Sequence, residues 1–308
     1  MIKKTLRKSC PNTIQEWYAD IKYYLRFKLY PQGLANEMHR GIVGYDINWK
    51  DPQTLNEKIN WMKFYGDTSL WASLADKIKV REYIKERIGE DILPKLYGVW
   101  ENANDIDFCK LPRRFVLKTN HGCGTVIPVA DSNKLDKEKA ILQLNTWLEK
   151  PFGYDTVEPH YLKIKPLVYA EEFLDNDSNI SSSLIDYKVH CFNGKAYYIM
   201  CCTDRILGQH ATFSFYDIDW HPLPEFSSDN LRDGFVSIPR PSQLDALLKY
   251  AEVLAKGHPL MRVDFYIIQD RIVFGEITMT PQGGYLDYLS SEGIQKMGAL
   301  VTLPKKRK

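Results

Sequence analysis

Apolar residues recur at helical spacing through the first ninety residues of the chain. Trp17, Ile21 and Tyr24 stand three to four positions apart, which predicts helical structure over residues 12–40. After Pro52 the same spacing predicts a capped helix with an apolar face. A further helix is expected over residues 74–88, followed by an extended segment. The N-terminal part of the chain is therefore expected to be mainly helical.

From Pro112 onward, short apolar runs separated by turn residues replace this pattern. Asn193-Gly194 lies between two such runs and predicts a hairpin, because both residues tolerate a positive φ. Amphipathic helices are predicted at 136–149 and 241–256. Extended structure is predicted at 93–100, 115–118, 126–129, 167–174, 187–202 and 261–278. Helices mixed with mainly hairpin-connected strands indicate an α+β fold.

Size and composition are those of a soluble globular protein with two or three subdomains. The chain has 308 residues, of which 44% are hydrophobic and 26% charged. Its net charge of +2 gives no strong preference for nucleic acid. No apolar run is long enough to span a bilayer, and no secretory signal pattern is present. Six cysteines without a C-x-x-C pair favour reduced thiols and a cytoplasmic location.

Positive charge is concentrated at the two ends of the chain. Residues 1–40 contain eight lysines and arginines against three acids, and residues 305–308 are all basic. Basic ends are ordinarily solvated tails. They also leave open a weak peripheral attraction to an anionic membrane surface or an acidic polymer, at about 1 kcal/mol per cation.

Two strand-like runs at 261–278 carry the most informative pattern of acids. A three-residue loop at 269–271 would pair Ile268 with Ile272 and place Asp264 opposite Glu276. Arg262 would then lie opposite Thr278, and Phe274 would share a face with Glu276. A loop of even length would instead put the two carboxylates on opposite faces.

Two facing carboxylates need a compensating charge. At about 5 Å they repel by roughly 3 kcal/mol at an effective dielectric near 20. Oxygen ligands on one rigid sheet face suit Mg²⁺, which also takes phosphate oxygens as ligands. The alternative is a solvated face on which Arg262 or Arg271 pairs with the acids.

A lysine followed by a glycine-containing loop is the second candidate feature. Lys118 ends a strand, and Gly122 and Gly124 let backbone N–H groups turn toward one anion. The alternative is an ordinary hairpin turn beside a solvated lysine. His121 and Cys123 could form a catalytic Cys–His pair, but their position two residues apart on one loop favours two loop residues without a catalytic role. The acids that end the strand at 167–174 could bind a nucleoside, or simply enter solvent.

The lysine and its loop, the acidic strand and the Arg-x-Asp/Glu hairpin follow one another along the chain, and this order of features resembles that of the ATP-grasp superfamily. Residues 261–264 with 274–281 are similar to the metal-binding hairpin of D-alanine–D-alanine ligases. Several short runs resemble the TupA-like branch, named for teichuronopeptide biosynthesis; they are 55–58, 75–77, 118–122, 186–188, 192–194 and 215–220. The resemblance implies two α+β lobes sandwiching ATP, with a helical N-terminal extension. It divides the chain into 1–110, 111–170 (small lobe) and 171–308 (large lobe).

The resemblance also implies roles for individual residues. Arg262 and Lys118 would be catalytic, and Asp264, Glu276 and Thr278 would bind Mg²⁺. Thr278 stands where the ligases carry asparagine, which leaves occupancy of a second metal open. The residues implied in ATP binding are Lys77, Lys118, Asn120, His121, Gly122, Gly124, Thr125, Glu171, Glu172, Phe173, Leu174 and Lys188.

The implied reaction is ATP-dependent formation of an amide through an acyl phosphate. The TupA-like branch suggests that an amino acid or amine is joined to a sugar carboxylate in surface polysaccharide biosynthesis, with substrate contacts from residues 203–221. A small-molecule kinase is a second enzyme hypothesis. A sugar-nucleotide glycosyltransferase using Asp217-Ile218-Asp219, or a non-catalytic polysaccharide-binding protein, are further alternatives. The acid, the amine and the oligomeric state stay open.

Overall fold

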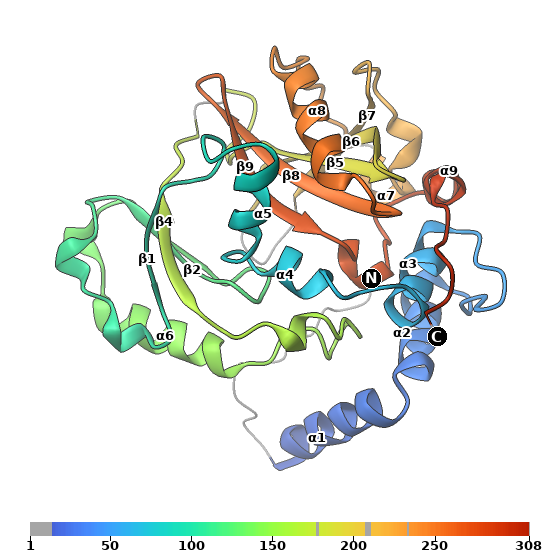
Figure 1. Ribbon diagram of the computed structural model, residues 1–308, viewed down its shortest axis with the longest axis horizontal. Coiled ribbons are helices and arrows are strands. Elements are labelled where there is room, and N and C mark those ends of the chain that lie inside the picture. Colours follow the sequence, from blue (N-terminus) through green and yellow to red (C-terminus); the bar gives the residue numbers. More distant parts are fainter. Residues whose placement is uncertain (1–13, 177–178, 207–210, 233, 308) are drawn as a thin grey trace.

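Two antiparallel sheets form the centre of the protein (Figure 1). The computed structural model describes residues 14–176, 179–206, 211–232 and 234–307. The small sheet has, in spatial order, β1 (Leu96–Trp100), β4 (Val168–Glu172), β2 (Phe115–Thr119) and β3 (Val126–Val129). The large sheet has β7 (Thr212–Asp217), β6 (Lys195–Thr203), β5 (Asp186–Phe192), β8 (Leu260–Ile268) and β9 (Arg271–Thr278).

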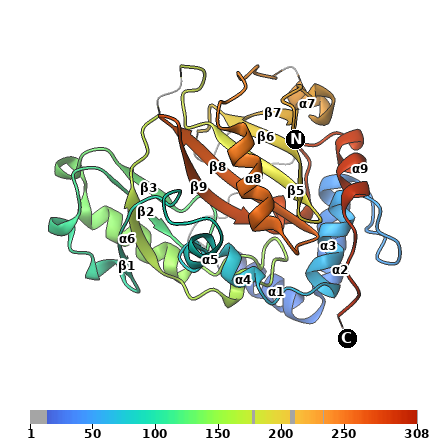
Figure 2. The same ribbon diagram turned by 45° about the horizontal axis from the view of Figure 1, so that its top comes forward.

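Helices cover the outer faces of both sheets. Figure 2 shows α8 (Leu244–Ala255) lying across one face of the large sheet, and α6 (Lys137–Glu149) lies against the small sheet. The other helices are α1 (Ile14–Leu29), α2 (Pro31–Val43), α3 (Leu55–Tyr65), α4 (Trp71–Ala75), α5 (Val80–Arg87), α7 (Asp229–Arg232) and α9 (Ser291–Leu300). Short 3₁₀ turns occur at Ala103–Asp105, Phe108–Lys110, Ser132–Lys134, Tyr161–Lys163, Pro224–Phe226 and Pro281–Gly284. This is the α+β architecture that the sequence predicts, and no helix in the described ranges is long and apolar enough to span a bilayer.

Two predicted helices are each broken by a residue that competes with the helical backbone. The segment 12–40 is two helices within its described part, because Pro31 lacks an N–H and begins α2 as its first residue. The predicted helix at 74–88 is also wrong as one piece. Asp76 accepts hydrogen bonds from the backbone N–H groups of Ile78 and Lys79, which ends α4 before α5 begins.

The capped helix expected after Pro52 is confirmed as α3. Thr54 and Glu57 form a reciprocal capping box, in which each side chain accepts from the backbone N–H of the other residue. The Asn193-Gly194 turn is also confirmed, since Phe192 pairs with Lys195 and both turn residues have positive φ. Pro128 lies on β3, an edge strand, where its missing N–H costs no ladder hydrogen bond within the sheet.

The β8–β9 hairpin reaches the predicted pairing by a different route. Its loop has two residues, Gln269-Asp270, both with positive φ, so Ile268 pairs with Arg271. The expected three-residue loop is therefore wrong. Gly275 is left unpaired in a β-bulge, and this extra residue restores the pairing of Asp264 with Glu276 and of Arg262 with Thr278.

The bulge also separates two residues that were expected on one face. Phe274 pairs with Phe265 and packs edge-to-face against it, whereas Asp264 and Glu276 lie on the opposite face. The expectation that Phe274 shares a face with Glu276 is thus wrong. Gly275 suits the bulge because a Cβ there would lie 3.0 Å from the carbonyl oxygen of Asp264.

Candidate active site between the two sheets

A row of charged side chains crosses the large sheet on the face away from α8. Lys188 on β5, Asp264 on β8 and Glu276 on β9 are direct neighbours across three strands. In the next row, His190 lies opposite Arg262, which lies opposite Thr278. Asp264 is only 1% exposed, so the middle of this row lies in the interior of the protein, whereas the Glu276 side chain at its end is 39% exposed.

Arg262 and Lys188 hold the Asp264 carboxylate from two sides. The guanidinium of Arg262 donates to both carboxylate oxygens at 2.7 Å, and the Lys188 ammonium contacts Asp264 Oδ2. Arg262 also donates to Glu276 at 3.1 Å and to the hydroxyl of Thr278 at 3.0 Å. These five side chains, predicted as site residues, are therefore connected in one network, with Arg262 contacting three of them.

Two further residues extend this network. Asp186 accepts from Lys188 at 2.6 Å and from Arg205 at 2.9 Å. The network then contains three acids (Asp186, Asp264, Glu276) and three bases (Lys188, Arg205, Arg262), and its formal charges balance. Such balance offsets the desolvation of buried ions.

The charged state of this network follows from the balance of burial and pairing. Burial by itself would lower the pKa of Lys188, but Asp186 and Asp264 raise it above its ordinary value. The same two effects leave the pKa of Arg262 well above its usual range. Burial, together with the cations of Arg262 and Lys188, lowers the pKa of His190 to about 3, so this imidazole is neutral.

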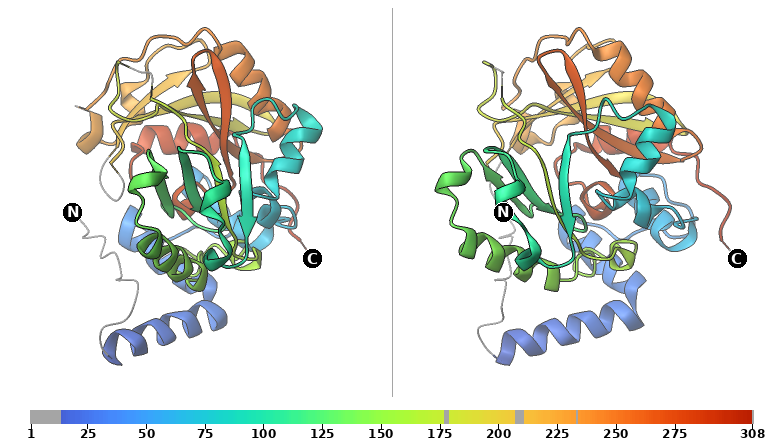
Figure 3. Two further views of the ribbon diagram at one scale, coloured as in Figure 1. Left: turned by 90° about the vertical axis from the view of Figure 1, so that its left-hand side faces the viewer. Right: turned by 60° about the vertical axis from the view of Figure 1, so that its left-hand side comes forward.

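Residues of the small sheet face this network. Lys118 contacts the Glu171 carboxylate and pairs along the ladder with Tyr169. Burial raises the pKa of the Tyr169 hydroxyl well above its usual value, and first Glu171, then Glu276 of the other sheet, raise it further. At the outer end, Arg271 of β9 donates to Glu172 of β4 at 2.6 Å. Glu171 of the small sheet and Glu276 of the large sheet thus both influence Tyr169, and Arg271 links the two sheets whose ribbons Figure 3 shows.

The glycine-containing loop after Lys118 is fixed by side chains from distant segments. Lys77 donates to the carbonyl oxygen of Gly122 at 2.6 Å. Asn120 is fully buried, donates to Asp76 at 2.9 Å and accepts from the backbone N–H of Leu167 at 2.7 Å. Asn120 therefore ties the base of the loop to two neighbouring segments.

The rest of this loop divides into buried and exposed positions. The hydroxyls of Thr119 and Thr125 lie 2.7 Å apart and close its neck, and Gly124 takes a φ of 74°. His121 is buried with its ring against the carbonyl of Lys150, and burial lowers its pKa, whereas Cys123 is exposed. The opposite exposures of His121 and Cys123 favour the structural interpretation over a catalytic pair.

The predicted nucleoside-binding segment is only partly directed toward the space between the sheets. Glu171 contacts Lys118 there, while Glu172 accepts from Arg271 and from the backbone N–H of Lys95 at 3.0 Å. Phe173 packs under the Arg114 guanidinium at 4.4 Å, and Leu174 is half-buried. Glu171 is thus the residue of this segment that contacts another predicted site residue.

The loop that follows Thr278 is anchored by two buried polar side chains, those of Glu158 and Lys63. The hydroxyl of Thr280 contacts Glu158, and Lys63 donates to the carbonyl of Gly283 at 2.7 Å. Burial lowers the pKa of Lys63 to about 7 and raises that of Glu158. These contacts fix the chain immediately after the predicted metal ligands.

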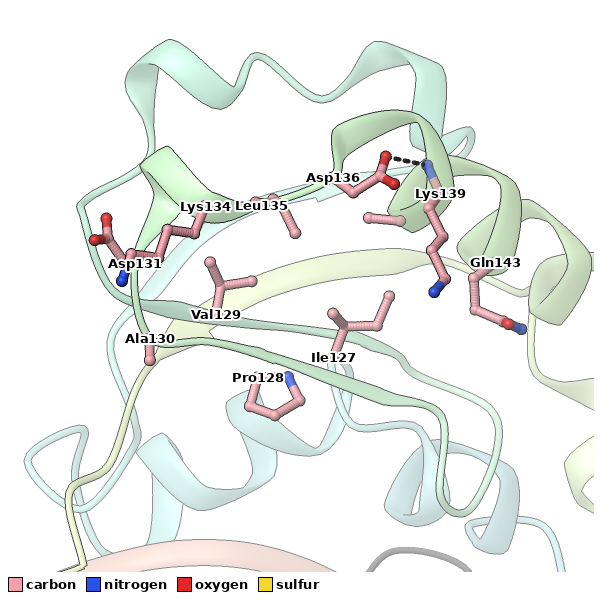
Figure 4. Close-up of a pocket in the computed structure, with 11 residues that line it drawn as sticks. Ile127, Pro128, Val129, Ala130, Asp131, Lys134, Leu135, Asp136, Lys139 and Gln143 are labelled. Carbon is pink, nitrogen blue, oxygen red and sulfur yellow. Dashed lines mark hydrogen bonds between the residues drawn. The ribbon is translucent and has the colours of Figure 1, made fainter.

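Two other features lie away from this network. A groove of about 510 Å³ between β3 and α6 is lined by residues with no predicted role (Figure 4); they are Ile127, Pro128, Val129, Ala130, Asp131, Lys134, Leu135, Asp136, Lys139, Ala140 and Gln143. Asp217, Asp219 and His221 gather at the end of edge strand β7, at the other side of the large sheet from β9. The Asp217 carboxylate accepts from the backbone of Asp219 and His221, so it caps its own turn.

Sequence reasoning missed Asp186 and His190 as neighbours of Lys188, and it missed Tyr169 on the other sheet. The spacing of Asp186, Lys188 and His190 places all three on one face of a strand, a pattern that alternation alone could have identified. Tyr169 has no comparable sequence signal, because its role depends on the approach of the second sheet.

Comparison with protein families identifies the chain as an ATP-grasp protein. Residues 57–302 match the family described as TupA-like ATPgrasp. The match covers well over half of the chain, so the chain belongs to this family and has the ATP-grasp fold that the sequence analysis predicts. A comparison with curated protein sequences found no match.

Solved structures with a similar arrangement include several ligases of low sequence identity. D-alanine–D-alanine ligase from Bacillus anthracis complexed with ATP shares 14% identity over 72% of this chain and 55% of its own, with a TM-score of 0.38. The Helicobacter pylori enzyme shares 19% identity over 74% and 61%, with a TM-score of 0.39. ATP-grasp ligase PsnB, complexed with minimal precursor, Mg and ADP, shares 11% over 72% and 57%, with a TM-score of 0.35. The chain thus spans little more than half the length of these proteins.

Proposed function

We propose that this protein is an ATP-dependent carboxylate–amine ligase that binds Mg-ATP between its two sheets. The supporting observation is the pairing of Asp264 with Glu276 on the inner face of the large sheet, in contact with Arg262. Membership of the TupA-like ATP-grasp family supports the same conclusion.

The side chains present suit Mg²⁺. Asp264, Glu276 and Thr278 offer hard oxygen ligands. Asp264 Oδ1 accepts a single hydrogen bond, from Arg262, and keeps a second lone pair, whereas Asp264 Oδ2 accepts from both Arg262 and Lys188. The Glu276 side chain is 39% exposed, which leaves it accessible to an ion that keeps its waters. Mg²⁺ bound there would offset the charge of the phosphates during transfer.

We assign the remaining site residues to three roles: binding the phosphates, binding the nucleoside, and stabilising the reacting group. Lys118 and Lys77 would hold the phosphates, with the 120–125 loop closing over them and excluding water. Residues 171–174 would bind the adenine and ribose, and Lys188 would add a phosphate contact. Arg262 would stabilise the charge that develops on the reacting group, because its guanidinium is already fixed by two carboxylates.

For the substrates, we propose a carboxylate on a saccharide and an amino acid or amine, joined through an acyl phosphate during surface polysaccharide biosynthesis in the cytoplasm. The TupA-like family carries this part of the proposal. Arg205 is a candidate for binding the carboxylate of the acid substrate. Its side chain is 43% exposed, and its guanidinium contacts the charged network through Asp186.

Thermal melting with Mg-ATP tests nucleotide binding directly. We expect Mg-ATP to raise the melting temperature of the native chain and to have little effect on Glu276→Gln. Asp270→Asn, on the tip of the same hairpin and bonded to Gln243, is the matched control and should keep the full shift. An equal shift in Glu276→Gln would contradict the proposed metal site.

Product analysis then separates the ligase from its rivals. Incubation with ATP, uronic acids and amino acids should give an amide, ADP and phosphate in equal amounts. A phosphorylated small molecule without an amide would identify a kinase instead. Release of a nucleoside diphosphate from a sugar nucleotide, without ATP, would identify a glycosyltransferase.

A further inference from the structure

An apolar stripe on α1 faces away from the body of the protein. Figure 1 and Figure 3 show this helix standing at one end of the molecule. Its inner face is anchored by Tyr23 and Phe27, which pack into a cluster with Leu34 and Val157. The outer face is more open: Leu25 is 51% and Leu29 83% exposed, while Tyr24 at its edge meets the Tyr154 ring edge-on and is still 41% exposed.

The exposed apolar residues of this helix fall at helical spacing. Ile21, Tyr24, Leu25 and Leu29 recur three to four positions apart, so they share one face. In the sequence the same spacing continues toward the N-terminus at Ile14, Trp17 and Tyr18. Five of the thirteen large exposed apolar residues in the described ranges lie between residues 21 and 30. Scattered single residues of this kind are normal, but a continuous stripe indicates an interaction surface.

The charges around the stripe indicate which partner it fits. Lys22 and Lys28 are exposed on the same helix, and the sequence before α1 adds Lys3, Lys4, Arg7 and Lys8. Residues 41–308, by contrast, contain more acids than bases. A second copy of the chain would set this basic face against itself, whereas a surface of anionic lipids complements it.

We propose that α1 docks the protein onto an anionic membrane surface, lying in the plane of the interface with its apolar stripe among the lipid headgroups. Aromatic side chains such as Tyr24 favour this depth, and the lysine stems extend to the phosphates. This surface is separate from the space between the two sheets, so the proposal does not depend on the proposed ligase activity.

Flotation of the full chain with vesicles tests the proposal. Vesicles of phosphatidylcholine and phosphatidylglycerol in equal parts should bind the protein, and high salt should weaken binding. Phosphatidylcholine alone should bind it poorly. Leu25→Asp with Leu29→Asp should weaken binding at least tenfold, and Lys22→Glu with Lys28→Glu by roughly fivefold or more for each lysine.

Matched controls come from α6, which lies against the small sheet. Leu142 is 70% exposed there and Lys139 is also exposed, so Leu142→Asp and Lys139→Glu should leave vesicle binding unchanged. Unchanged melting temperatures establish that the exposed α1 variants fold. The proposal is overturned if native protein ignores anionic vesicles, or if the α1 variants bind as well as the native chain. Concentration-dependent dimers abolished by Leu25→Asp, without vesicle binding, would assign the stripe to a second copy.

Discussion

Replacing Lys188 by methionine removes one cation from the balanced charge network of the large sheet. Lys188 lies 2.6 Å from Asp186 and also contacts Asp264. At this distance and an effective dielectric near 20, the attraction to one carboxylate is about 6 kcal/mol. Desolvation of the buried ions, at several kcal/mol each, offsets part of it. We expect Lys188→Met to lower the free energy of unfolding by about 3–5 kcal/mol, because two buried carboxylates lose a shared partner.

Urea unfolding followed by tryptophan fluorescence measures this change, since the chain has seven tryptophans. Lys195→Met is the matched control: it lies on the neighbouring strand, where its ammonium is exposed and 3.3 Å from Glu252, and should cost less than 1 kcal/mol. Adding Asp264→Asn to Lys188→Met should cost less than the sum of the single changes. The pKa of Lys188 is raised, so its contribution is complete below pH 10.5 and is lost only above that. A loss below 1 kcal/mol for Lys188→Met would refute the reasoning.

Two further predictions concern pH and the bulge. Burial lowers the pKa of both His160 and His190 to about 3. The unfolded chain therefore binds more protons than the folded chain between pH 6.5 and 3, and the free energy of unfolding should be lower by about 2 kcal/mol per histidine at pH 5. Urea unfolding midpoints at several pH values would detect this loss. A flat pH profile in that window would contradict this. Gly275→Ala should cost about 1–3 kcal/mol and reduce the Mg-ATP melting shift, because its Cβ would lie 3.0 Å from the carbonyl of Asp264. The control Gly41→Ala, in α2 with no atom within 4 Å of the new Cβ, should stabilise by up to about 1 kcal/mol, and equal effects at both glycines would count against the bulge argument.

The site illustrates how far local sequence reasoning extends. The pairing of Asp264 with Glu276 was predicted correctly although the loop length was wrong, because Gly275 compensates for the shorter turn. Nothing in the local alternation reveals a bulge, since it depends on how the two strands pair over their whole length. Asn120 was expected to bind ATP, and its contacts with Asp76 and Leu167 come from segments more than forty residues away.

Local patterns in the sequence determined the elements whose cause is local: the Thr54–Glu57 capping box, the Asn193-Gly194 turn and the alternation on β8. Tertiary structure alone decided which charges meet. Lys188 joins Asp264 because β5 lies beside β8, and Glu276 acts on Tyr169 because the second sheet approaches the first. Hydrogen bonding along the chain is encoded within a few residues, whereas these contacts depend on how strands distant in sequence pack once their apolar faces are buried.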